Sequence, residues 1–248
     1  MKKFASFFAV FLFITLFAVA SEAGDRNIPV EVAQLTDSLK KQFAPDRRVA
    51  LLDVDYSFSD KNVMLRGVTT SAEAKNALLK ELARKGYAVM DCLELLPDVK
   101  GLEGKTCGII NVSVANMRVA PDFSSEMMTQ SLMGMPVRVL QRDGWVRIQT
   151  PDNYIAWVHR VGVHPVTEEE MAAWNKAEKI VVTAHYGFVY SEPNQTSQTV
   201  SDVVAGNRLK WEGSKGAFYK VTYPDGRRGY ISKSIAMPEK KWRSGLQQ

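Results

Sequence analysis

The sequence predicts a small α+β domain followed by two all-β barrels that a short helix joins. Helical and strand periodicities alternate up to about residue 98, and short turn-rich strands with many aromatic residues dominate from Gly108 onward. The second region also contains an internal repeat. Of the 248 residues, 46% are hydrophobic and 24% are charged, a composition that is typical of folded globular proteins and excludes wholesale disorder.

Residues 1–20 are predicted to be a signal peptide. Lys2 and Lys3 form a basic start, and an uncharged apolar run from Phe4 to Ala20 ends on small residues of the kind that signal peptidase cleaves. A retained anchor is the alternative, but a run of this length lies at the lower edge of what spans a bilayer. We therefore expect an exported protein of the periplasm or cell envelope, without a stable transmembrane anchor.

The charge of the chain is mildly basic. The formal net charge is +5, and loss of Lys2 and Lys3 with the signal peptide leaves 30 basic residues against 27 acidic ones. Nucleic-acid binding requires clustered Lys and Arg and not merely an alkaline pI. The sequence therefore predicts no nucleic-acid partner.

Residues 28–98 are expected to form the α+β domain. Apolar residues at three- and four-residue spacings predict a helix over 29–43, and strands are predicted over 49–56 and 63–68. A second helix is expected from Ser71 to Gly86, a C-cap residue, and a third strand over 87–93.

This first domain resembles the BON-type domains of exported bacterial proteins. The resemblance rests on Asn62–Val68, on Glu73 and Ala74 at the start of the second helix, and on Gly86–Val89. It implies association with envelope surfaces, and a packing domain without a ligand of its own is the alternative.

An internal repeat organises the rest of the chain. Trp145–Val158 and Phe218–Ile231 align without a gap at an offset of 73, each with Pro-Asp at a hairpin turn. Met117–Pro121 and Val189–Pro193 match upstream. Two barrels are therefore expected, over 108–165 and 180–237, with a tail over 238–248. Thr167–Glu170 form a predicted capping box that opens a spacer helix over 167–179.

The two modules resemble bacterial SH3-like (SH3b) domains. The first resemblance rests on Val112–Arg118, Gly144–Ile148 and Ala156–Val158, and the second on Pro224–Ile231. A pair of such modules is similar to the non-catalytic half of NlpC-type cysteine peptidases, which cut γ-D-glutamyl–diamino-acid bonds in peptidoglycan. The fold class is thus an α+β domain followed by two all-β SH3-like barrels joined by a short helix.

The sequence departs from those peptidases in its chemistry. Their nucleophile lies in an Asp-Cys-Ser-Gly motif after the second module, whereas no cysteine lies beyond Cys107 in this sequence. The three histidines lack a zinc-type spacing and are expected to be surface or turn residues. We therefore expect no catalytic residues, no metal and no cofactor.

The two cysteines are open to three interpretations. Cys92 and Cys107 lie beyond the predicted signal peptide, and an oxidising compartment favours a disulfide between them. Two buried free thiols are the second interpretation, and a catalytic cysteine is the third.

A ligand-binding face is predicted on the first barrel. Strand alternation directs Val146, Ile148, Ala156 and Val158 into the core and leaves large aromatic residues outside. The candidate ligand-binding residues are Asn116, Arg118, Trp145, Tyr154 and Trp157. Packing of these aromatic residues against the spacer helix, where Trp174 is available, or against the N-terminal domain is the alternative.

The predicted function is non-catalytic binding of a peptidoglycan stem peptide or a cell-wall protein. One alternative is the targeting half of a split peptidase, whose partner would be a separate peptidase catalytic domain. Another is an unrelated enzyme that uses the N-terminal domain.

Overall fold

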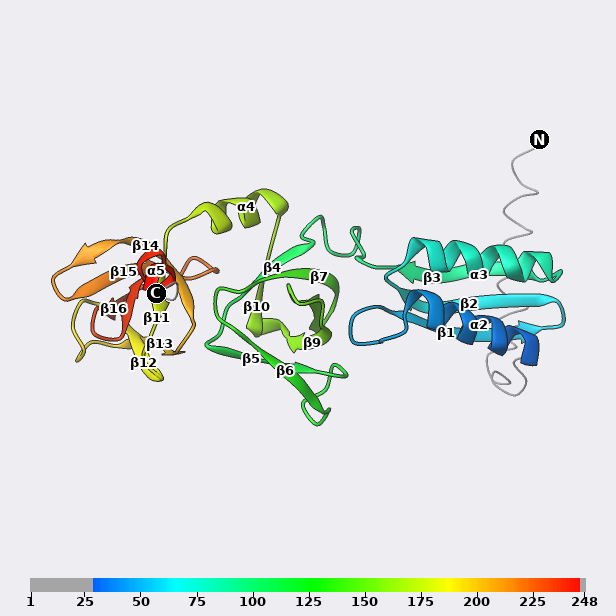
Figure 1. The fold of residues 1–248 in the computed structure, drawn as a ribbon, viewed down its shortest axis with the longest axis horizontal. Helices are drawn as coiled ribbons and strands as arrows, with labels where there is room; N and C mark the ends of the chain where they lie inside the picture. The colour runs from blue at the N-terminus through cyan, green and yellow to red at the C-terminus, as the bar shows by residue number, and fades with distance from the viewer. Residues whose placement is uncertain (1–28, 246–248) are drawn as a thin grey trace, which may run out of the picture. The chain divides into compact units, whose positions relative to one another are not determined.

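The computed structural model describes residues 29–245 (Figure 1), so the predicted signal peptide lies outside the described residues. The chain divides into two compact units between Leu96 and Pro97. Between residues 29 and 245, no helix has both the length and the apolar composition that crossing a membrane requires.

The first unit builds one core from two helices and a three-stranded sheet. Its elements are α2 (Val30–Phe43), β1 (Leu52–Ser59), β2 (Asn62–Thr69), α3 (Ala72–Arg84) and β3 (Ala88–Leu95). Strands β1 and β2 form an antiparallel hairpin, whereas β2 and β3 run parallel because α3 connects them. The two predicted helices and three predicted strands are confirmed, with ends that shift by up to three residues.

Local capping explains where α3 begins and ends. The Ser71 hydroxyl accepts a hydrogen bond from the backbone N–H of Ala74 at 3.0 Å, which satisfies a donor of the first helical turn. After Lys85, Gly86 adopts φ +83°, a conformation that glycine enters without the steric cost of a Cβ atom.

The second unit contains two seven-stranded sheets with the same strand order. In the first the order is β10-β4-β7-β8-β9-β5-β6, and in the second β17-β11-β14-β15-β16-β12-β13. The strands of the first are β4 (Cys107–Ile110), β5 (Val114–Arg118), β6 (Met127–Leu132), β7 (Pro136–Asp143), β8 (Trp145–Gln149), β9 (Ile155–His159) and β10 (Val163–Val166). Those of the second are β11 (Lys179–Val182), β12 (Tyr186–Tyr190), β13 (Thr199–Val204), β14 (Arg208–Lys215), β15 (Phe218–Thr222), β16 (Arg228–Ser232) and β17 (Ala236–Pro238).

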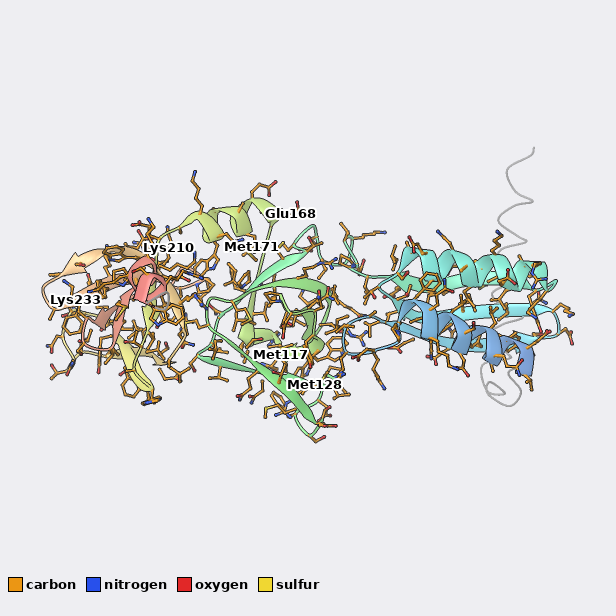
Figure 2. The ribbon with its side chains drawn as sticks, in the orientation of Figure 1. Met117, Met128, Glu168, Met171, Lys210 and Lys233 are labelled. Atoms are coloured by element: carbon orange, nitrogen blue, oxygen red, sulfur yellow. The ribbon has the colours of Figure 1, made fainter. Side chains whose placement is uncertain are left out.

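Each sheet curls around its own apolar core. In the first barrel, the four residues predicted to point inward are at most 2% exposed: Val146, Ile148, Ala156 and Val158. The buried Met117, labelled in Figure 2, belongs to the same core. The second barrel repeats this arrangement with Val221 and Ile231.

The spacer helix α4 (Glu168–Lys176) begins at the predicted capping box, in which Thr167 and Glu170 exchange hydrogen bonds. It ends before the predicted Lys179, because Lys179 already opens β11. The Lys179 ammonium donates to the carbonyls of Trp174 (2.6 Å) and Ala177 (3.0 Å) and so caps the helix C-terminus. Burial lowers the pKa of Lys179.

A last helix, α5 (Glu239–Gly245), lies within the predicted tail. The carboxylate of Glu239 binds Arg208 at 2.9 Å and Arg243 at 2.7 Å, which ties this helix to β14 of the second barrel. The two arginines also lower the pKa of Glu239, although burial opposes them.

Equivalent turns of the two barrels meet within the second unit. Met133, from the turn after β6, is fully buried in the core of the second barrel. In return, the side chain of Asn207 donates to the Ser113 carbonyl at 2.8 Å, and the Ser113 hydroxyl donates to Asp202 at 2.6 Å.

Candidate ligand-binding site

Three aromatic side chains gather on the outer face of the first barrel. Trp145 on β8 lies directly opposite His159 on β9, and their ring centroids are 5.3 Å apart. Phe123, from the loop between β5 and β6, lies 4.9 Å from Trp145 and 5.1 Å from His159. Phe123 is 68% exposed, so the cluster offers an open ring to solvent.

Hydrogen bonds fix the loop that carries Phe123. The Ser125 hydroxyl accepts from the Ala120 N–H at 2.9 Å, and the Asp122 carboxylate accepts from the Ser124 N–H at 2.7 Å. The bonds from Ser124 lower the pKa of Asp122, so this carboxylate remains charged and holds the turn. The loop therefore positions Phe123 without needing the ring itself for packing.

A cavity of about 210 Å³ opens beside this cluster. The rings of Phe123, Trp145 and His159 lie among its lining residues, and β5 adds two polar side chains, Asn116 and Arg118. The Arg118 guanidinium donates through one terminal nitrogen to the Ser125 carbonyl, which anchors it at the cavity. Apolar rings beside a guanidinium suit a ligand with an apolar body and a carboxylate.

The structure brings three of the five predicted binding residues to this cavity: Asn116, Arg118 and Trp145. Trp157 lies on the same outer face but is not among the cavity residues, and the Arg147 guanidinium covers its ring at 5.1 Å. Tyr154 lies in the segment before β9, where its backbone N–H donates to the Thr150 hydroxyl at 3.0 Å.

Two residues of the site, Phe123 and His159, are not among those predicted from the sequence. His159 was expected to be a surface or turn residue, but it is half-buried at the end of β9 and contacts two aromatic rings. Strand alternation from Trp157 could have identified it. Phe123 lies in an irregular loop and therefore follows no such pattern.

The expected alternative, in which Trp174 covers these aromatic residues, is not what the structure shows. Trp174 packs on Ile109 and Val166 and donates from its indole N–H to the Gly134 carbonyl at 3.2 Å. It therefore anchors α4 to the first barrel at a place outside the cavity.

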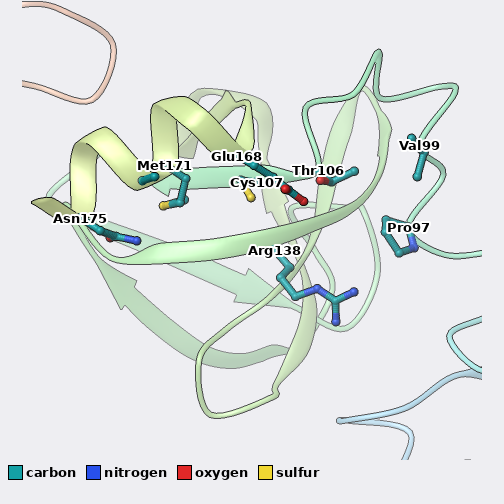
Figure 3. A pocket seen from close by; sticks show the side chains of 9 residues that line it. Pro97, Val99, Thr106, Cys107, Arg138, Glu168, Met171 and Asn175 are labelled. Atoms are coloured by element: carbon teal, nitrogen blue, oxygen red, sulfur yellow. The ribbon is translucent and has the colours of Figure 1, made fainter.

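A second hollow, of about 570 Å³, lies beside the start of α4 (Figure 3). Cys107, Arg138, Glu168 and Met171 help to line it. Burial, followed by the charge of Glu168, raises the pKa of the Cys107 thiol, which favours the neutral form over the nucleophilic thiolate. This environment does not activate a cysteine.

Both cysteines are free thiols in the structure: Cys92 is exposed on β3 and Cys107 is half-buried on β4. They belong to different units, so their pairing stays a prediction. Within residues 29–245, no three His, Cys, Asp or Glu side chains gather in a way that could hold a metal ion.

Comparison with known families identifies both barrels. Residues 117–161 match the family described as bacterial dipeptidyl-peptidase Sh3 domain, and residues 185–235 match the bacterial SH3 domain family. The chain contains two bacterial SH3 domains. No curated protein matches the sequence.

Solved structures that match the chain include NlpC/P60 proteins. One is an NlpC/P60 family protein from Bacillus cereus ATCC 10987, with 20% identity, a TM-score of 0.44, and coverage of 53% of this chain and 55% of that chain. Another is an NlpC/P60 endopeptidase from Photobacterium damselae subsp. piscicida, with 13% identity, a TM-score of 0.42, and coverage of 86% and 45%. The chain thus spans about half the length of these proteins.

Proposed function

We propose that the protein is an exported, non-catalytic component of the cell envelope that binds peptidoglycan stem peptides through its first SH3 domain. One observation carries this proposal: the cavity combines an exposed aromatic ring, Phe123, with an anchored guanidinium, Arg118. A stem peptide offers the matching chemistry, because it has short apolar side chains and free carboxylates.

The family comparison supports a peptide ligand. The family that matches residues 117–161 is named after bacterial dipeptidyl-peptidases, which act on peptides. Binding without catalysis is favoured by the environment of Cys107, whose raised pKa leaves the thiol protonated.

The first unit has a supporting role in this proposal. Its α+β arrangement, with the parallel pair of β2 and β3, resembles a BON-type module, which would add a second attachment to the envelope. Besides the stem peptide, the sequence suggests two further partners: a cell-wall protein and a separate peptidase catalytic domain.

Co-sedimentation of the protein, without its predicted signal peptide, with purified sacculi tests the proposal. Phe123→Ala and Arg118→Gln should each weaken binding about tenfold, because each removes one of the two groups that contact the ligand. Tyr154→Ala is the matched control, because Tyr154 is an aromatic residue of the same barrel outside the cavity.

Soluble stem peptide should compete with the sacculi for the wild-type protein. Circular dichroism should show that each variant is folded. Undiminished binding by folded Phe123→Ala and Arg118→Gln proteins would refute the proposal. Binding that stem peptide does not displace would instead favour a wall protein as the partner.

A further inference from the structure

The second barrel carries a different set of side chains at the place that corresponds to the cavity. Strands β5 and β12 occupy the same position in the two sheets. Where β5 presents Asn116 and Arg118, β12 presents Phe188 and Tyr190. The charged and amide groups of the first barrel are thus replaced by aromatic rings in the second.

These rings form a continuous ladder on the outer face. Tyr186, Phe188 and Tyr190 alternate along β12, with ring centroids 5.1 Å and 6.4 Å apart. Tyr230 on β16 lies directly opposite Tyr190 and extends the row across the sheet. The core of the second barrel contains none of these four residues, so their rings are not needed to fill it.

The ladder is accessible and has polar tips. Tyr186 is 58% exposed, and the other three residues are half-buried. In the part of the chain that the structure describes, the hydroxyls of Tyr186, Tyr190 and Tyr230 make no hydrogen bond, and they remain available to a ligand.

The electrostatics of the ladder differ from those of the first barrel. Asp202 pairs with Phe188 across the sheet, and its carboxylate accepts a hydrogen bond from the Ser113 hydroxyl at 2.6 Å. The cation that faces Tyr230 is Lys220, at one end of the row. The rings of the ladder themselves are uncharged, so a ligand that packs on them need not carry a charge.

We propose that this aromatic ladder is a second binding site, which takes the sugar rings of a glycan strand. Pyranose rings pack their C–H faces on aromatic rings, and their hydroxyls exchange hydrogen bonds with tyrosine hydroxyls. A row of rings along one strand suits a polymer that offers one sugar after another. The inference rests on the proposed function only in taking the cell wall as the source of the ligand.

Peptide-free glycan strands, prepared from sacculi by removal of the stem peptides, are the probe for this site. The double variant Phe188→Ala/Tyr190→Ala should bind these strands at least about tenfold more weakly than the wild-type protein. Tyr190→Phe should retain most of the affinity because it keeps the ring. Phe123→Ala should bind the glycan normally, because that residue lies on the first barrel.

Free stem peptide, measured on the same proteins, separates the two sites. The ladder variant should bind the peptide as the wild-type protein does, and its circular dichroism spectrum should show that it is folded. Wild-type affinity of the folded ladder variant for glycan would overturn the inference, as would the absence of glycan binding by the wild-type protein. Loss of peptide binding in the ladder variant would overturn it too, whereas a failure of peptide binding alone would refute only the proposed function.

Discussion

The two barrels of the second unit share a frame but differ in the side chains that they display. The loop after β5 and the loop after β12 repeat the same hydrogen bonds: Ser197 accepts from the Glu192 N–H at 3.2 Å, just as Ser125 accepts from Ala120. Yet the position of Phe123 is taken by the exposed Gln195. Backbone pairing and a few short polar side chains therefore preserve the fold, while the outer positions are available for different ligands.

The turns through which the barrels meet also combine the same backbone conformation with different side-chain contacts. Gly134 and Gly206 occupy equivalent turns and both have a positive φ, of +85° and +88°. The first turn sends the apolar Met133 into the other barrel, whereas the second sends the polar Asn207 to the Ser113 carbonyl. Equivalent backbone thus supports one apolar and one polar contact.

The largest expected effect comes from replacing one of these two glycines. A Cβ atom on Gly134 would lie 2.3 Å from the backbone oxygen of Arg208, whereas one on Gly206 would meet only the flexible end of Leu132 at 2.9 Å. Gly134→Ala should cost about 2–5 kcal/mol, from the left-handed conformation and the backbone clash together. Gly206→Ala should cost about 1–2 kcal/mol, chiefly from its conformation.

Denaturation in urea, followed by tryptophan fluorescence, measures this difference. All five tryptophans of the sequence lie beyond residue 96, so the signal reports the second unit. Equal losses of stability in the two variants would show that the close approach to Arg208 does not contribute.

The next effect depends on pH and concerns the second barrel. Burial raises the pKa of Tyr223 to about 12, and the Ser201 hydroxyl lies 2.7 Å from its phenol oxygen. The folded state therefore holds the proton more tightly than the unfolded state does. The contribution of the protonated Tyr223 to the free energy of unfolding is fully present below pH 10. It is lost as the pH rises to 12, and the loss amounts to about 3 kcal/mol. The equivalent residue of the first barrel, Thr150, does not titrate in this range.

Tyr223→Phe isolates this effect. At neutral pH the variant should be less stable than the wild-type protein by about 1 kcal/mol, because it lacks the hydrogen bond to Ser201. Between pH 10 and 12 the gap should close and then reverse. Parallel losses of stability in both proteins over that range would contradict the assignment to Tyr223.

The comparison of the barrels also explains what the sequence could predict. The repeat, the capping box at Thr167 and the inward positions of β8 and β9 follow from short-range patterns, and the structure has all of them. The offset between the copies is 72 residues up to β14 and 73 from β15. The reason is the hairpin turn, which is one residue long in the first barrel (Gly144) and two residues long in the second (Gly216 and Ala217). A tight turn of this kind accepts one more residue without changing the strand order.

The site was harder to predict for a physical reason. Asn116, Arg118 and Trp145 follow strand alternation and could be assigned to the outer face from the sequence. Phe123 reaches the cavity only because the bonds of Asp122 and Ser125 fold its loop back over β8 and β9, and no periodicity encodes that path. The contact of Met133 with the second core likewise depends on long-range packing.

The smallest expected effect on stability comes from exchanging the two loop residues. Phe123→Gln and Gln195→Phe should each change the free energy of unfolding by less than about 0.5 kcal/mol, because both positions are exposed and the loops are held by other groups. Urea denaturation, followed by tryptophan fluorescence, measures this change. A larger loss would show that the Phe123 ring supports its loop.

Stem-peptide binding should respond quite differently from stability. Phe123→Gln should weaken it about tenfold, as expected for Phe123→Ala. Adding Gln195→Phe should not restore it, because the second barrel lacks the rest of the cluster: Phe218, at the place of Trp145, is only 9% exposed, and Ser232, at the place of His159, pairs with the Ser234 hydroxyl at 2.8 Å. Restored affinity in the double variant would mean that one loop ring on a common frame is sufficient for binding, and that Trp145 and His159 are not needed.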